Sequence, residues 1–306
     1  MNNRNNRETA AVFGLILAAL FWGISYPLTK FVEACPTFYI ISIRFAVAAV
    51  IIAFFARKKF AGCSRELIKN ALILSVVITS MYIFNILGVK YTTAVRASFF
   101  TTLSFLIVPV MNLILYKVRI SRTIFFSAAI CLAGIYMLCY RPDGIGFSIN
   151  LGDFLCFLAS IAGSINIIYI EKMSRDTSID NTLLMTFLMA FVSLWGTVIA
   201  LIRGDLAYGG ASAQELLVIL IMGIFCSAGA FILQIHSEKH VSSNRVGIIF
   251  ALEPASGCIL SVLILRETMS AVGWAGACVI ILSIIFMELS VSRDQKRRIK
   301  ETEHES

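Results

Sequence analysis

Two charged residues lie within otherwise apolar stretches of this 306-residue chain. Glu253 precedes Pro254 in "FALEPASGCILSVLILRET" (250–268). A carboxyl in a low-dielectric setting can exchange a proton, and a proline leaves the carbonyl four residues earlier, that of Phe250, without its usual helical donor. Glu253 is therefore either a proton- or cation-binding residue at a weakened point of a helix, or a neutral carboxyl that bonds to a neighbouring helix.

The second charge is Arg44, in "ISIRFAVAAVIIA" (41–53). Its long side chain could extend to the membrane surface. Alternatively, its planar guanidinium could hold a substrate carboxylate through two parallel hydrogen bonds. A third interpretation is an ion pair with Glu253 or Asp153.

Uncharged polar and aromatic residues complete a candidate substrate cavity. Some are three residues apart, such as Tyr82 and Asn85, and so share a helix face. Each could instead join two helices, but together they suit a small zwitterion or a planar metabolite. The cavity candidates besides Arg44 are Trp22, Ser25, Tyr26, Tyr82, Asn85, Thr101, Ser104, Asn166, Gln234 and Ser256.

The elements that must position these residues follow from composition. The chain is 58% hydrophobic and 14% charged, whereas soluble domains carry roughly 25% charged residues. Its apolar runs are long enough to cross the bilayer as helices, because lipid-facing backbone groups must bond within their own segment. The ten predicted spans are Thr9–Thr29, Thr37–Phe55, Ala71–Val89, Ala97–Tyr116, Thr123–Tyr140, Leu151–Ile170, Thr182–Ile202, Leu216–His236, Val246–Leu265 and Ala271–Leu289.

The basic residues predict the orientation. Most of the 26 Lys and Arg residues fall in the segments that share one side with the N-terminus. Because cytoplasmic loops are enriched in Lys and Arg, we expect a multi-pass plasma-membrane protein with both termini cytoplasmic. The polar segment 290–306 is expected to be a disordered cytoplasmic tail. The net charge of +8 fits contact with an anionic lipid surface rather than with nucleic acid.

An internal repeat relates the two halves. "YIFNILGVKYTTAVRAS" (82–98) aligns with "FILQIHSEKHVSSNRVG" (231–247), and "FGLILAALFWG" (13–23) aligns with "LGDFLCFLASI" (151–161). Five spans per repeat is an odd number, so the halves must have opposite orientations. Inverted repeats are typical of secondary transporters, whose substrate site lies between the halves near the midplane.

Several stretches resemble the ten-helix EamA branch of the drug/metabolite transporter superfamily. They are "LFWGISYPLTKF" (20–31), "ISIRFAVAAVIIA" (41–53), "TTAVRASFFTTLSFLIVPVMNLILYKVRIS" (92–121) and "SSNRVGIIFALEPASGCILSVLILRETMSAVGWAGACVIILSII" (242–285). The resemblance implies two EamA repeats, 9–140 and 151–289, and transport of small metabolites. One departure is that Glu253 aligns with Ser104, so only one half has the acidic position.

Motifs of other protein classes are missing from the sequence. It contains no His-Glu-x-x-His, Gly-x-Ser-x-Gly or Walker sequence, and its eight cysteines form no Cys-x-x-Cys pair. We therefore expect no enzyme activity, catalytic residue, metal site or cofactor. The expected partners are a small-molecule substrate, the lipid bilayer and protons as the coupling ion.

The sequence thus predicts an all-α polytopic membrane protein with ten transmembrane helices in two inverted five-helix repeats. The function that fits is a secondary-active permease that exports a small polar metabolite, such as an amino acid, in exchange for protons, with Glu253 as the coupling residue. The alternatives are an importer of the same substrate class, a membrane scaffold or sensor without transport, and, less favoured, an intramembrane enzyme.

Overall fold

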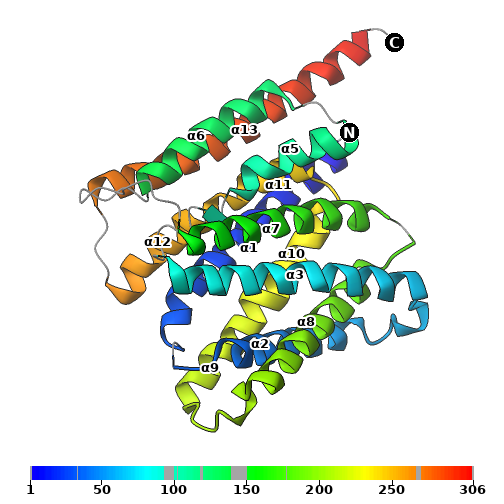
Figure 1. Ribbon diagram of the computed structural model, residues 1–306. Helices are drawn as coiled ribbons and strands as arrows, with labels where there is room; N and C mark the ends of the chain where they lie inside the picture. Colours follow the sequence, from blue (N-terminus) through cyan, green and yellow to red (C-terminus); the bar gives the residue numbers. More distant parts are fainter. Residues whose placement is uncertain are drawn as a thin grey trace.

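The described part of the chain is helical in the computed structural model, with no strands (Figure 1). It comprises residues 2–32, 34–92, 100–101, 103–117, 120–138, 150–176, 178–266 and 270–304; for residues 2–5, 26, 89–90, 138, 258, 261, 288 and 291–304 only the backbone is described. The elements are α1 (Asn2–Lys30), α2 (Thr37–Ala56), η1 (Phe60–Gly62), α3 (Arg65–Tyr91), α5 (Ser104–Tyr116), α6 (Arg122–Leu138), α7 (Leu151–Arg175), α8 (Asn181–Arg203), η2 (Asp205–Ala207), α9 (Ala213–Ile221), η3 (Met222–Gly229), α10 (Ala230–Glu238), α11 (Ser243–Phe250), α12 (Leu252–Leu265) and α13 (Ala271–His304).

These helices occupy the ten predicted spans, except for residues 97–99, 102 and 139–140, which lie outside the described residues. Within the described residues, seven helical segments are long and apolar enough to cross a membrane, and three shorter apolar ones are Ser104–Tyr116, Arg122–Met137 and Ala271–Met287. Large hydrophobic side chains such as Phe55, Phe125 and Ile202 are exposed on the outside, as a bilayer requires. The ten-helix membrane fold predicted from the sequence is confirmed.

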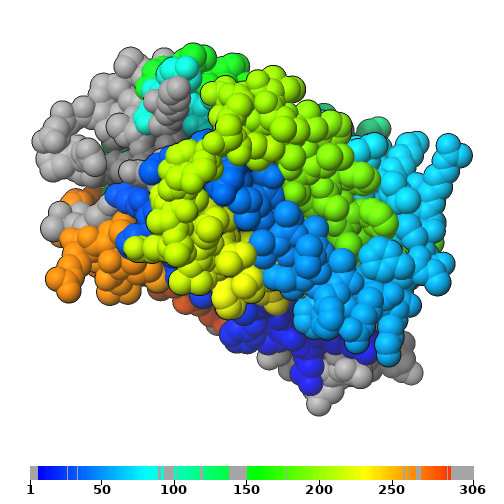
Figure 2. Space-filling view, turned by 90° about the horizontal axis from the view of Figure 1, so that it is seen from below, coloured from blue at the N-terminus to red at the C-terminus, as the bar shows by residue number. Residues whose placement is uncertain are grey.

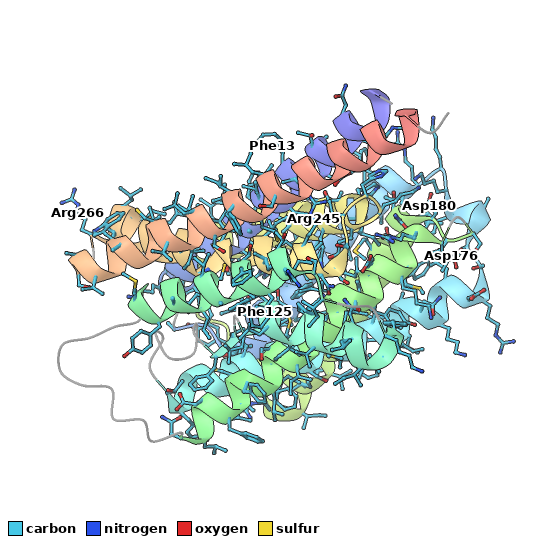
Figure 3. The ribbon with its side chains drawn as sticks, turned by 90° about the horizontal axis from the view of Figure 1, so that it is seen from above. Phe13, Phe125, Asp176, Asp180, Arg245 and Arg266 are labelled. Carbon is cyan, nitrogen blue, oxygen red and sulfur yellow. The ribbon has the colours of Figure 1, made fainter. Side chains whose placement is uncertain are left out.

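The bundle has two ends, which Figure 3 marks with Asp176 and Asp180 on one side and Arg266 on the other. We call these the Asp180 end and the Arg266 end. In Figure 1 the N-terminus and the C-terminus lie on the same side of the bundle. The polar segment after residue 290 continues α13 as a helix to His304, where the sequence predicted disorder.

Two helix contacts express the inverted repeat in the packing. α3 packs against α7 and α10 packs against α1. At the first contact a Cβ on Gly152 would lie 2.6 Å from the carbonyl oxygen of Gly88. At the second, a Cβ on Gly14 would lie 2.5 Å from Oγ of Ser237. The sequence alignment pairs Gly14 with Gly152 and Gly88 with Ser237, so the two contacts are equivalent, each joining one helix of the first half to one of the second.

Two membrane-spanning segments depart from regular α-helix, one near a proline and one over a run of small residues. The span containing Glu253 is interrupted at Ala251, between α11 and α12, three residues before Pro254. The interruption agrees with the hydrogen bond that Pro254 cannot donate. The span that includes Gln234 is interrupted by the π-helix η3, which the sequence analysis did not predict. Such π-helical turns occur frequently at functional sites.

Candidate functional site

Arg44 lies inside the bundle and is bound to the π-helical turn. Its Nε donates to Oγ of Ser227 at 2.6 Å, and its Nη2 donates to the carbonyl oxygen of Cys226 at 3.1 Å. Arg44 is only 7% exposed, so its side chain does not extend to the surface. Its guanidinium also lies 5.7 Å from the ring centre of Phe45 and 5.8 Å from that of Tyr82. Protein contacts thus hold the cation while leaving Nη1 without an acceptor among the described residues.

A chain of aromatic rings runs through the bundle beside Arg44. Tyr82 contacts Phe45 edge-on with 5.2 Å between ring centres, and Phe45 lies 6.4 Å from Phe231. Trp22 then contacts both Phe231 and Phe250, at 5.4 and 4.9 Å. The buried Nε1 of Trp22 has no acceptor in the part of the chain that the structure describes, although a buried indole N–H usually finds one. The rings connect α3, α2, α10, α1 and α11 and supply one unused donor.

Glu253 lies in the first turn of α12, directly after the interruption at Ala251. It is half-buried. Tyr82 and Cys226 are each close enough to feel the charges of both Glu253 and Arg44. The structure therefore brings an anionic and a cationic side chain from opposite halves of the chain into one neighbourhood, without an ion pair between Arg44 and any acid among the described residues.

α1 approaches α12 closely at this level. A Cβ on Gly23 would lie 2.0 Å from Oγ of Ser256, so Ser256 is part of this helix contact. The hydroxyl of Ser25 donates to the carbonyl oxygen of Trp22 in its own helix, at 2.6 Å. The side chain of Tyr26 lies outside the described residues. Of the α1 candidates with described side chains, only Trp22 offers a free polar group.

The first-half candidates Asn85 and Thr101 bind each other. Nδ2 of Asn85 donates to Oγ1 of Thr101 at 3.0 Å. Ser104 begins α5 three residues further on. This pair joins α3 to the following span, which is the helix-joining role that the sequence left open for each polar residue.

Gln234 of α10 and Asn166 of α7 are both buried. Nε2 of Gln234 donates to Oε1 of Glu238 at 2.7 Å. Among the described residues, the side-chain oxygens of Gln234 and Asn166 have no hydrogen-bond partner. Gln234 therefore bonds along its own helix, three residues from Phe231 of the aromatic chain.

A separate cavity of about 220 Å³ lies between α3 and α8 and contains none of the predicted site residues. It is lined by Val76, Thr79, Ser80, Trp195 and Ile199. Figure 2 shows a nearby face of the bundle, formed by α2, α8 and the segment around residues 205–240, as closely packed.

Sequence reasoning missed two features. It treated Glu238 as part of a loop, because the predicted span ended at His236; in the structure α10 continues to Glu238, which is fully buried. It also missed the π-helix that binds Arg44. The run of small residues in "CSAG" (226–229) is the available signal, since small residues allow close helix approach.

The family signature covers nearly the whole chain. The EamA-like transporter family matches residues 9–140 and 150–289. The chain belongs to the EamA-like transporter family. As an EamA-like protein it is a multi-pass membrane protein of a transporter family, with a lipid environment.

Curated relatives of this EamA-like chain carry the same broad description. An uncharacterized transporter of Archaeoglobus fulgidus is 25% identical over 92% of this chain and 86% of its own length. An uncharacterized transporter of Clostridium kluyveri is 27% identical over 89% and 90%. The uncharacterized transporter YetK of Bacillus subtilis is 24% identical over 90% and 86%.

A solved crystal structure shares the fold. It is 15% identical, covers 93% of this chain and 98% of its own, and superposes with a TM-score of 0.79. At this identity the likeness is one of fold alone.

Proposed function

We propose that this EamA-like protein is a secondary-active exporter of a small polar metabolite, an amino acid or a related compound, driven by proton exchange. The observation that carries the proposal is that the buried Arg44 and the half-buried Glu253 lie close enough to act on the same two side chains, Tyr82 and Cys226. A site with a fixed guanidinium can hold a carboxylate, and a carboxyl in the same neighbourhood can hold an ammonium group or a proton. Amino acids carry both groups, and the aromatic chain suits their apolar parts.

Alternating access follows from the inverted halves. Arg44 comes from the first half and Glu253 from the second, in the first turn of α12 after the interruption at Ala251. Intramembrane charges of this kind usually mark substrate or proton pathways, and inverted-repeat transporters place their sites at the interface of the halves. Rocking of one half against the other would expose the site to each side in turn.

The orientation and boundaries belong to the same proposal. The Lys and Arg distribution favours a plasma-membrane protein whose Asp180 end and both termini face the cytoplasm. The repeats are then 9–140 and 151–289, followed by the cytoplasmic segment 290–306.

The test compares the metabolites outside cells that express wild type, Glu253→Gln, Glu66→Gln or no protein, at matched membrane levels. Glu66 is an exposed acid at the start of α3 and serves as the control substitution. We expect one metabolite to accumulate outside with wild type and Glu66→Gln but not with Glu253→Gln, because only the site carboxyl is lost.

Two outcomes contradict parts of the proposal. Equal accumulation with wild type and Glu253→Gln would make Glu253 a structural residue that bonds between helices. No difference between any protein and the empty control would reject export and favour an importer or a non-transporting scaffold.

A further inference from the structure

A fully buried acid lies at the Asp180 end of the bundle. This acid, Glu238, is the last residue of α10. Its Oε1 accepts one hydrogen bond from Gln234, and its Oε2 has no partner among the described residues. No basic side chain among the described residues lies within ion-pair distance of it. Burying an unpaired charge costs far more free energy than burying a neutral carboxyl, so the packing fits the protonated acid.

The charged groups around Glu238 come mainly from α7. Glu171 and Arg175 are close enough for their charges to act on its carboxyl. They already bind each other, with 2.8 Å between Nη2 of Arg175 and Oε1 of Glu171. The other titratable and charged side chains on neighbouring segments at this end include Arg7 and Glu8 of α1, Lys172 of α7, Asp180 before α8 with its partner Lys59, His236 on the exposed side of α10, Lys239, His240 and Arg245.

Glu171 also holds the start of α11. Its Oε2 accepts the backbone N–H of Ser243 at 2.9 Å. Asn112 of α5 donates to Oγ of Ser243 at 2.8 Å and to Oδ1 of Asn244 at 2.6 Å. We call the bond from Ser243 to Glu171 the α7–α11 latch. It joins the two helices at the end of the bundle from which α11 leads to the interruption before Glu253.

We propose that Glu238 is a proton-binding site that controls the α7–α11 latch. When the proton leaves Glu238 for water at this end of the bundle, a carboxylate appears beside Glu171 and Arg175. The new charge repels the Glu171 carboxylate and competes with it for the Arg175 guanidinium that holds it in place. The repulsion moves the released Glu171 carboxylate away from Ser243, and the first N–H of α11 loses its acceptor.

The two neighbouring histidines, His236 and His240, can be separated from Glu238 as the source of a pH response. Burial, followed by the charges of Lys239 and Arg7, lowers the pKa of His240, so its imidazole is neutral throughout the range above pH ~7. His236 is exposed and its ring Nδ1 lies 2.9 Å from the carbonyl oxygen of Ile232. A change of hydrogen-exchange protection above neutral pH that persists in His236→Gln therefore comes from neither His236 nor His240.

Hydrogen exchange tests the proposal on the full-length protein in lipid nanodiscs without any substrate. Exchange of the amides at 243–250 is followed from about pH 5.5 to about pH 8.5 and corrected for the intrinsic pH dependence of exchange. We expect wild-type protection at Ser243 to fall about tenfold or more as pH rises, because a hydrogen bond to a charged acceptor is lost. Glu238→Gln should keep the high protection at every pH.

Matched variants separate this site from its neighbours and from the transport site. His236→Gln and Glu253→Gln should retain the wild-type response, because neither removes the Glu238 proton. Glu171→Gln keeps an oxygen that can accept from Ser243 but removes the charge that Glu238 repels, so its response should fall by at least half. This variant keeps the test valid if Glu238→Gln fails to fold.

The proposal is overturned if wild-type protection at Ser243 does not change with pH, or if Glu238→Gln or Glu171→Gln responds as wild type does. Because no substrate is used, these outcomes are independent of whether the protein exports a metabolite.

Discussion

The contact of α3 with α7 and the contact of α1 with α10 are equivalent in the inverted repeat but differ in construction. In the first, Gly152 faces backbone atoms of α3, with a virtual Cβ 2.6 Å from the Gly88 carbonyl oxygen and from the Thr92 amide nitrogen. In the second, the position of Gly88 is taken by Ser237, and the nearest atom to Gly14 is a hydroxyl. Backbone against backbone leaves no atom that can rotate away, whereas a serine hydroxyl can.

The equivalent helices of the two contacts, α3 and the α9–η3–α10 segment, also differ in regularity. α3 is one continuous α-helix from Arg65 to Tyr91, whereas its counterpart is divided into α9, η3 and α10. The interruption exposes the carbonyl of Cys226 and the hydroxyl of Ser227 to Arg44. The α3–α7 contact is therefore the rigid one, whereas the divided helix α9–η3–α10 of the second half supplies the adaptable backbone around the site.

The largest expected effect is that of Gly152→Ala. Its Cβ would meet backbone atoms that cannot move without shifting α3, and overpacking of this kind costs about 1–3 kcal/mol. We expect a loss of stability near the upper end of that range. Unfolding of the purified protein in mixed detergent, followed by circular dichroism, measures it.

Gly14→Ala is the matched variant in the other half. Its Cβ lies near a hydroxyl that can rotate, so we expect a loss below about 1 kcal/mol. Combining Gly14→Ala with Ser237→Gly should restore the wild-type midpoint. If Gly14→Ala proved as costly as Gly152→Ala, the difference between the two contacts would be rejected.

Arg44→Lys is expected to affect both folding and transport. A lysine cannot reproduce the paired donors to Ser227 and Cys226, and a hydrogen bond to a charged group is worth about 1.5–3 kcal/mol. We expect a stability loss in that range and at least about a tenfold loss of transport.

Ser227→Ala keeps the guanidinium and removes one of its acceptors. We expect this variant to lose about 1.5 kcal/mol of stability, the lower end of the range for a bond to a charged group, and to retain most transport, measured with the metabolite that the export assay identifies. Equal transport by Arg44→Lys and wild type would show that the guanidinium only anchors η3.

The smallest effect is expected for Lys59→Ala, which removes an exposed ion pair at the Asp180 end. Nζ of Lys59, in the connection before α3, lies 2.8 Å from Oδ2 of Asp180, which caps α8 through the amides of Thr182 and Leu183. Because solvent screens an exposed pair, Lys59→Ala should cost about 0.2–1 kcal/mol. Added salt should reduce that cost in the same unfolding assay.

The pH dependence of this pair has a definite sign. Burial opposes ionisation of Asp180, but the hydrogen bonds from Lys59 and the Leu183 amide outweigh it and lower its pKa. A carboxyl with a lowered folded pKa stabilises the fold above its unfolded pKa, and that contribution disappears as pH falls through the folded pKa. Asp180→Asn should therefore lose more stability at neutral pH than in acid; the opposite order would contradict the assignment.

The sequence determined the helices and their approximate limits. Each span is an apolar run whose backbone must bond within itself in a bilayer, so Thr37–Phe55 was predicted within one residue of α2. The interruption before Glu253 was also predictable, because Pro254 removes a local donor whatever the surroundings. The pairing of Gly14 with Gly152 likewise follows from the sequence repeat.

Only the tertiary structure decided which polar groups meet. The acceptors of Arg44 lie 182 and 183 residues away in sequence, on a π-helical turn whose geometry depends on how α2 packs against it. Asn85 bonds to the next span while its counterpart Gln234 bonds within its own helix to Glu238. A local pattern fixes what a residue can donate or accept, but its partner depends on the distance between helices, which the packing of the whole bundle sets.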